Sequence, residues 1–335
     1  MIDSTLPLID LHRHIEGSVR LETILDLGWE HNLSLPAWDL ENLRSYLQVT
    51  EIQPGVMAFI EKCKWAVGIL VDYDTRRRIA YENVEDAQEE GIDYIELRFS
   101  PLFMAKPHGL DPFGVVEATI DGATKAVRDT EMQVNLIGIL SWTYGPDQAW
   151  KELDALLRQK YKLVAIDLAG DEANFPGEIF VEQFRRVRDA GLAVTIHTGE
   201  SSGPQSVWQS VLDLRAGRLG HAVRAIEDET LLDYLADNKI GIESNLTSNV
   251  QTSTVTDYAV HPLRIYLERG LLATINTDDP QISGIDLHYE NQVAAPAAGL
   301  NQKQIVTAQI NALKIAFLSD QERNMLLVKQ TQSAL

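Results

Sequence analysis

The chain has 335 residues, a net charge of −20 at pH 7 and a hydrophobic content of 45%. This length suits one large α/β barrel, predicted as a single domain over residues 1–335, which can bury its core without disulfides or a structural metal. With Cys63 as its one cysteine, the chain cannot form an intramolecular disulfide or a zinc site of several thiolates.

The acidic balance and the apolar segments limit the expected partners and location. Negative charge repels phosphate backbones, so we expect no nucleic-acid partner, whereas a small neutral substrate is compatible with it. Residues 1–7 carry no basic region or long apolar run, and no stretch approaches the ~20 apolar residues of a membrane span. We therefore expect a cytoplasmic protein without a membrane partner.

Short apolar runs recur along the chain, and most are followed by an amphipathic stretch. Their content of Val, Ile and Leu is typical of parallel strands buried on both faces. The predicted strands are residues 6–14, 94–100, 134–140, 163–169, 193–197, 218–221, 240–244 and 272–276. The clearest predicted helices are residues 74–90, 112–130, 176–190 and 228–238. Gly91, Gly191 and Gly270 follow helical segments, where a left-handed C-cap favours glycine.

Eight strands alternating with helices predict a (β/α)8 TIM-type barrel. The competing architecture is a doubly wound open sheet. Such a sheet normally carries a Gly-rich phosphate loop after its first strand, whereas the first strand here ends in His-Arg-His.

Reactive side chains follow nearly every predicted strand. In a barrel these strand ends converge on the face that carries the active site. The residues concerned are His12, His14, Asp167, Gly170, Asp171, His197, Glu200, His221, Asp278 and Asp279.

Four of these residues suit a metal ion. His12 and His14 are two apart on a strand, so their rings point the same way. Together with His197 and Asp278 they suit one Zn²⁺ per chain with a position left for water. A two-metal relative would need a bridging ligand, often a modified lysine, after the fourth strand, and the sequence there is Asp-Leu-Ala-Gly-Asp-Glu.

Zinc lowers the pKa of bound water and makes it a nucleophile near neutral pH. His221 is the candidate base for that water, and Glu200 is the candidate acid toward the substrate. Taken singly, His221 could equally be a packed core histidine and Glu200 a loop carboxylate. Beside a metal cluster at the same barrel face, the functional interpretation is favoured.

The same residues lie in motifs that run in one order along nearly the whole chain. The motifs are LIDLHRHIEGSVR, ELRFSP, DLAGDE, IHTGE, LGHAV, ESNLTSN, NTDDP and AAPAAGL. In this ordered set the sequence resembles the adenosine deaminases of the amidohydrolase barrels, and most of all the bacterial ones.

The resemblance implies a role for each residue. His12, His14, His197 and Asp278 would bind zinc, with His14 also bordering the substrate. Glu200 would protonate purine N1, and His221 would orient and deprotonate the water. Asp279 would bond N7, the backbone N–H of Gly170 would meet N3, and Glu16 would face the ribose 5′-hydroxyl.

The sequence departs from the family pattern at three positions. Glu16 stands where adenosine deaminases usually have Asp, Thr198 where Ala is commoner, and Ala222 where Gly is usual. Several adenine-type and modified-adenine relatives have Glu at the first position. The implied reaction is deamination of adenosine and 2′-deoxyadenosine to the inosine product and ammonia, with adenine or a modified adenine nucleoside as the alternative substrate.

Two other function classes stay open, and the sequence does not give the oligomeric state. One is a metal-dependent hydrolase of an amide, ester or phosphoester, which the missing lysine and Glu200 disfavour. The other is a barrel that binds nucleosides without turnover, which has no use for an acid, a base and four ligands.

Residues 34–71 form an insertion after the first strand, longer than a typical connection. Val56, Met57, Phe59, Ile60 and Cys63 within it have helical spacing. A helix packed on the barrel is the favoured interpretation, and an apolar lid over the purine, where the family has one, is the functional alternative.

Overall fold

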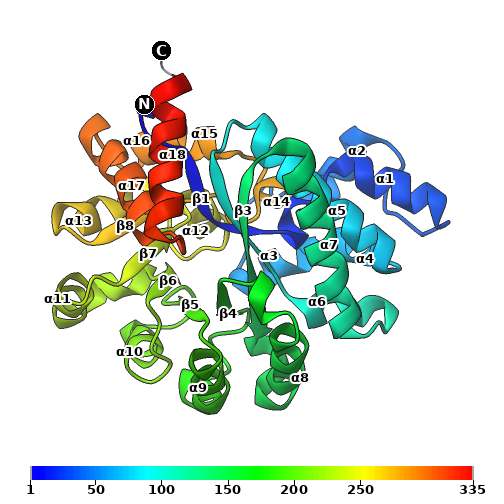
Figure 1. Cartoon of the computed structure of the whole chain (residues 1–335), viewed down its shortest axis with the longest axis horizontal. Coiled ribbons are helices and arrows are strands. Elements are labelled where there is room, and N and C mark those ends of the chain that lie inside the picture. Colours follow the sequence, from blue (N-terminus) through cyan, green and yellow to red (C-terminus); the bar gives the residue numbers. More distant parts are fainter. Residues whose placement is uncertain (1, 334–335) are drawn as a thin grey trace.

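The computed structural model describes residues 2–333 and contains the predicted barrel, with eight parallel strands in sequence order at its centre (Figure 1). The strands are β1 (Ile9–His14), β2 (Tyr94–Phe99), β3 (Gln133–Ser141), β4 (Ala165–Ala169), β5 (Ala193–Thr198), β6 (Arg218–His221), β7 (Gly241–Ser244) and β8 (Leu272–Ile275). β8 and β1 approach at a parallel bridge between Asp278 and Arg13, just beyond β8. The neighbouring His14 N–H donates to the Asp278 carbonyl at 2.8 Å, so the first and last strands meet at the predicted metal ligands.

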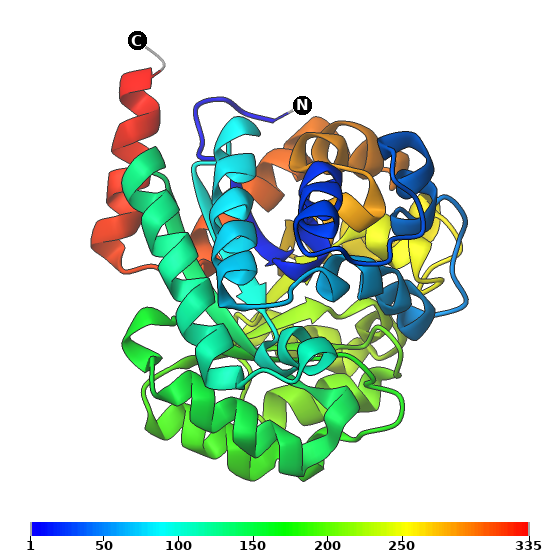
Figure 2. The ribbon, with the colours of Figure 1, turned by 90° about the vertical axis from the view of Figure 1, so that its right-hand side faces the viewer.

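Helices surround these strands, as the two views at right angles show (Figures 1 and 2). Those before β5 are α1 (Leu21–Glu30), α2 (Leu40–Leu47), α3 (Val56–Ile60), α4 (Lys64–Gly68), α5 (Tyr73–Glu89), α6 (Pro101–Ala105), α7 (Pro112–Thr130), α8 (Gly145–Leu157) and α9 (Val181–Asp189). Those after β5 are α10 (Pro204–Leu212), α11 (Glu229–Asp237), α12 (Leu246–Gln251), α13 (Leu263–Glu268), α14 (Pro280–Ser283), α15 (Leu287–Tyr289), α16 (Ala295–Ala297), α17 (Gln302–Ile315) and α18 (Asp320–Ser333).

Local sequence explains several of these boundaries. Asp72 begins α5 with a capping box, in which its side chain accepts from the N–H of Thr75. Gly91, Gly191 and Gly270 have φ of 75°, 82° and 78°, the left-handed conformation expected after a helix. The four predicted helices match α5, α7, α9 and α11 to within a few residues, except that the first turn of the third is the 3-10 helix Gly177–Phe180.

The inside of the barrel is charged, whereas its outer face packs apolar residues against the helices. Arg98 lies 2.7 Å from both Asp167 and Glu243, and Arg218 pairs with Glu243 and Glu96. All five side chains are at most 1% exposed. Buried charges are stable only when they are paired and hydrogen-bonded, so this network fixes the positions of its carboxylates.

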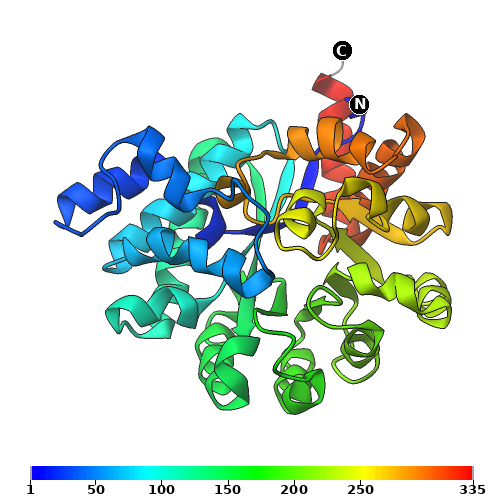
Figure 3. The same ribbon diagram turned by 180° about the vertical axis from the view of Figure 1, so that it is seen from behind.

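The insertion at residues 34–71 is helical and passes across the strands in the rear view (Figure 3). It contains α2, α3, the 3-10 helix Glu61–Cys63 and α4. Phe59 and Cys63 are buried, whereas Met57 is 40% exposed. The helical prediction is confirmed, and closure over a substrate stays a prediction. Among residues 2–333, none of the helices has the length and apolar character needed to cross a bilayer.

Candidate active site

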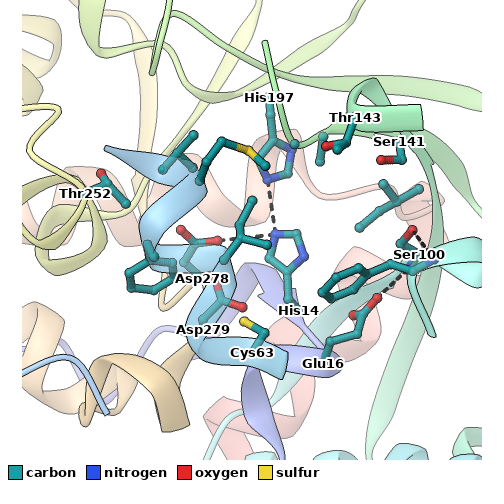
Figure 4. Close-up of a pocket in the computed structure, with 18 of the residues that line it drawn as sticks. His14, Glu16, Cys63, Ser100, Ser141, Thr143, His197, Thr252, Asp278 and Asp279 are labelled. Carbon is teal, nitrogen blue, oxygen red and sulfur yellow. Dashed lines mark hydrogen bonds and ion pairs between the residues drawn. The ribbon is translucent and has the colours of Figure 1, made fainter. Parts of the chain in front are cut away.

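A cavity of about 290 Å³ opens at the carboxyl ends of the strands, where the sequence predicts the site. Strand ends supply most of its polar side chains, and the insertion supplies an apolar wall around Phe59 and Cys63. His14, His197 and Asp278 lie on one side of this cavity, and Glu16 lies farther along it beside Ser100 (Figure 4). Of the strand-end residues named from the sequence, all line the cavity except His12, Asp167 and Asp171, and Glu16 lines it too. His12 lies beneath the cavity against Asp278.

The four predicted metal ligands converge. Nε2 of His12 is 3.1 Å from Asp278 Oδ1, and Nε2 of His14 is 3.3 Å from the same oxygen. Nε2 of His14 also lies 3.1 Å from Nε2 of His197. Although burial alone would raise it, His12 and His221 hold the pKa of Asp278 well below its usual range. A carboxylate therefore faces three imidazole nitrogens.

Two buried carboxylates orient these imidazoles from behind. Nδ1 of His12 lies 2.7 Å from Glu243, and Nδ1 of His197 lies 3.0 Å from Asp167. Burial would raise the pKa of both carboxyl groups, but His197 and Arg98 hold the pKa of Asp167 well below its usual range. Arg218, Arg98 and His12 do the same for Glu243. Since each carboxylate accepts the Nδ1–H of its histidine, Nε2 of each ring keeps its lone pair.

This donor set fits a bound cation. Nε2 of His12 is fully buried and has no hydrogen-bond partner among residues 2–333, yet it faces the anionic Asp278. The Nε2 lone pairs of His12 and His14 both face the Asp278 carboxylate. These electron pairs and the negative charge repel one another unless a cation lies between them. Burial lowers the pKa of His197 to about 4, so its ring is neutral and available as a ligand.

His221 and Glu200 stand beside this cluster. Nε2 of His221 is 3.7 Å from Glu200 Oε2 and 3.9 Å from Asp278 Oδ2. Burial lowers the pKa of His221 well below its usual value and raises that of Glu200 well above, which favours a neutral ring beside a protonated acid. His221 also falls within one group of possible ligand atoms with His12, His197 and Asp278, so distance alone does not separate it from the ligands.

Glu172 holds the loop that carries Glu200. Its carboxylate accepts the N–H groups of four consecutive residues, Gly199, Glu200, Ser201 and Ser202, at 2.7–3.2 Å. It also accepts a hydrogen bond from the hydroxyl of Thr198 at 3.1 Å, so one of the sequence departures adds a contact here.

Glu16 lines the cavity beside Ser100 (Figure 4). Its Oε1 accepts the N–H of Ser100 at 2.6 Å, whereas its buried Oε2 has no hydrogen-bond partner in the described part of the chain. Burial raises the pKa of Glu16. An unpartnered carboxyl oxygen in a buried cavity wall needs a polar group from the ligand.

Asp279 and Gly170 complete the lining. Burial, with Asp278 as the next cause, raises the pKa of Asp279 well above its usual value. Gly17 gives Asp279 its space, because a Cβ there would lie 1.7 Å from Asp279 Oδ1. Gly170 has φ of 111°, and a Cβ there would lie 2.6 Å from the hydroxyl oxygen of Thr143. A side chain at Gly170 would therefore be strained and crowded.

Asp167, Glu172 and Glu243 are functional carboxylates for which the sequence predicts no role. Each is a carboxylate in or directly after an apolar strand, and the first two were visible in the motif DLAGDE. A charge inside a fully buried strand was the available signal, because such a charge needs a partner.

The family model for adenosine deaminase matches residues 7–332. The chain belongs to the adenosine deaminase family. The adenosine deaminase of Vibrio cholerae is 56% identical over 329 residues, which cover 98% of each chain. Membership makes the chain a metal-dependent amidohydrolase that acts on a C–N bond.

Solved structures share the fold at lower sequence identity. Adenine deaminase from Arthrobacter aurescens aligns with a TM-score of 0.89 and 24% identity, over 98% of this chain and 99% of that chain. An amidohydrolase from Burkhoderia ambifaria with bound Zn aligns with a TM-score of 0.88 and 22% identity, over 98% and 91%.

Proposed function

We propose that this chain, working as one barrel domain, deaminates adenosine and 2′-deoxyadenosine hydrolytically with one zinc ion, releasing ammonia. The observation that carries the proposal is the unpartnered, buried Nε2 of His12 facing Asp278, beside the acid Glu200. The resemblance to adenosine deaminases at 56% identity supports the substrate.

We propose His12, His14, His197 and Asp278 as the zinc ligands. Three imidazoles and one carboxylate are ligands that zinc accepts, and they leave a position for water. A zinc ion there would lower the pKa of a water molecule and make it a nucleophile near neutral pH. His221, 3.9 Å from Asp278 Oδ2, would lie beside that water and orient it.

Glu200 and Asp279 suit the two ring nitrogens of a purine. N1 and N7 carry lone pairs, so each needs a donor. The raised pKa of both side chains favours the protonated form, which can donate. A proton from Glu200 on N1 weakens the N1–C6 double bond, and water can then add at C6 to give a tetrahedral carbon that expels ammonia.

Glu16 would bind the ribose. Its Oε2 has no partner within the described chain and could accept the 5′-hydroxyl, while Oε1 stays on Ser100 N–H. Such a charge-assisted bond contributes about 1.5–3 kcal/mol. If Glu16 instead fills the ribose space, adenine is the better substrate. The apolar wall from Val56 to Cys63 would exclude water from the purine.

Ammonia release from a panel of 6-aminopurines tests this function. We expect kcat/KM for adenosine to exceed that for 5′-deoxyadenosine by roughly 10–150-fold, the factor equivalent to the lost hydrogen bond. Adenine should react more slowly still. Adenine as the best substrate would replace adenosine but keep the deaminase, whereas no ammonia from any of them would reject the deaminase.

A further inference from the structure

A chain of hydrogen bonds leads from the backbone to His221 through two side chains that the mechanism above does not use. The N–H of Leu263 donates to Nδ1 of His261 at 3.1 Å. Nε2 of His261 lies 3.1 Å from Oδ1 of Asn249, whose Nδ2 lies 2.9 Å from Nδ1 of His221. His261, Asn249 and His221 are at most 3% exposed.

The backbone amide of Leu263 determines which atom donates and which accepts in each of these hydrogen bonds. A backbone N–H can only donate, so Nδ1 of His261 must carry a lone pair. Burial lowers the pKa of His261 to about 3, so its ring is neutral and the proton is on Nε2. That N–H donates to Asn249, so the atom of this amide that faces His261 is its oxygen.

The other end of Asn249 is therefore its NH₂ group, and it donates to Nδ1 of His221. Asn245 places its Nδ2 3.2 Å from the same nitrogen, a second contact of the same kind. A nitrogen that accepts at this position cannot carry the ring proton. The neutral ring of His221 then has its proton on Nε2, the nitrogen that faces Glu200 and Asp278.

We propose that Asn249, oriented by His261, is a positioning residue that holds His221 in the tautomer with its proton on Nε2. The catalytic meaning of this tautomer rests on the proposed function, but the tautomer itself does not. In this form His221 donates a hydrogen bond to the oxygen of the attacking water and cannot accept a proton at that atom.

This assignment changes the role expected from the sequence, which made His221 the base. The proton lost by the water needs another acceptor, and the carboxyl groups of Glu200 and Asp278 lie within 4 Å of Nε2. Glu200 becomes a carboxylate once it has given its proton to N1. It can then accept one proton of the water and pass it to the leaving amine. As ammonia leaves and the C6 carbonyl forms, the C6 hydroxyl returns its proton to Glu200, so the protons balance and the acid is restored.

The tautomer can be measured directly by NMR on the full-length, zinc-loaded protein with ¹⁵N-labelled histidine. Protonated and unprotonated ring nitrogens resonate in separate ranges, and the His221 signals are those missing from His221→Asn. We expect an unprotonated Nδ1 and a protonated Nε2. A protonated Nδ1 in the unmodified protein would overturn the proposal, and this measurement needs no variant of Asn249 or His261 to fold.

Asn249→Asp tests the function of the tautomer. Aspartate has the same shape but accepts at both oxygens, so it should keep the bond from His261 and draw the His221 proton to Nδ1. A wrongly placed histidine proton reduced kcat about 10⁴-fold in a serine protease, and we expect roughly a 10²–10⁴-fold fall here with KM and zinc content little changed.

Asn311→Asp is the matched control, because Asn311 is a buried amide whose NH₂ group donates to the carbonyls of Leu271 and Ala273. It should lose stability but keep the His221 tautomer and most of kcat. An unchanged tautomer or an unchanged kcat in Asn249→Asp would reject the positioning role. A wild-type protein with the expected tautomer but no deamination would reject the proposed function alone.

Discussion

The carboxylate of Glu172 accepts the backbone N–H of Glu200 at 3.2 Å, and it binds the three neighbouring amides in the same loop. The acid of the proposed reaction is therefore held by a second acid that lies one strand away. Both side chains are buried. The position of Glu200 therefore depends on Glu172, a carboxylate that does not line the cavity.

Glu172→Gln should displace Glu200 without removing it. The amide NH₂ replaces one acceptor oxygen and faces N–H donors, which leaves buried groups unpaired at a cost of about 1–3 kcal/mol. We expect kcat to fall at least roughly tenfold, with zinc content unchanged, when turnover and metal are measured together. Glu182→Gln, on the exposed face of α9, is the control. Wild-type kcat in Glu172→Gln would contradict the positioning role.

Glu200→Gln should fold, keep its zinc and lose roughly 10²–10⁴-fold in kcat, because an amide cannot protonate N1. Glu61→Gln removes a carboxyl from the exposed rim of the same cavity and should react nearly as the unmodified protein does. Since the raised pKa of Glu200 favours its acid form, activity should decline as pH rises through that pKa. A loss of less than tenfold would leave Glu200 a structural residue.

The purified protein should contain one zinc per chain. Metal analysis of the isolated protein, before and after dialysis against a chelator, measures both content and dependence. Removal should abolish deamination, and zinc should restore it. Two equivalents of metal, or full activity without any, would reject the single-ion site at His12, His14, His197 and Asp278.

His221→Ala separates a ligand from a neighbour of the metal. His221 lies close enough to the cluster to be a fifth ligand by distance alone, yet its Nε2 proton would prevent coordination. We expect zinc content to stay at the wild-type level while kcat collapses. Loss of zinc would make His221 a ligand and would also contradict the tautomer.

Glu152 supports the Glu16 end of the cavity and should make stability depend on pH. It is fully buried, accepts the N–H of Ser141 at 2.8 Å, and burial raises its pKa from 4.5 to about 7. Between these values the folded chain binds more protons than the unfolded chain, so the contribution of Glu152 to the free energy of unfolding falls as pH rises.

Glu152→Gln removes this titration. The stability difference between the unmodified protein and the variant should therefore shrink, by up to about 1.4 kcal/mol per pH unit, between pH 4.5 and about 7. Urea unfolding of both proteins over that interval measures it, with Glu182→Gln as a control whose difference stays flat. A difference that does not vary with pH would contradict the raised pKa of Glu152.

The sequence by itself determined the barrel and where its reactive residues gather. Alternation of short apolar runs with helices, and the side-chain period of two along a strand, are local properties that place His12 and His14 together. That strand ends share one face of a barrel is a rule of the architecture. The histidines and carboxylates at the strand ends could therefore be predicted without coordinates, whereas lining residues such as Ser141, Thr143 and Thr252 were not predicted.

Only the tertiary structure decided which side chains hydrogen-bond to the histidines of the site and orient them. Glu243 is 231 residues from His12, and the bond from Asn249 to His221 depends on where α12 lies over β6. Such contacts depend on strand register and side-chain rotamers across the barrel, which no local pattern encodes. The tautomer of His221 depends on them as well, because the backbone amide that sets it lies 42 residues along the chain, at Leu263.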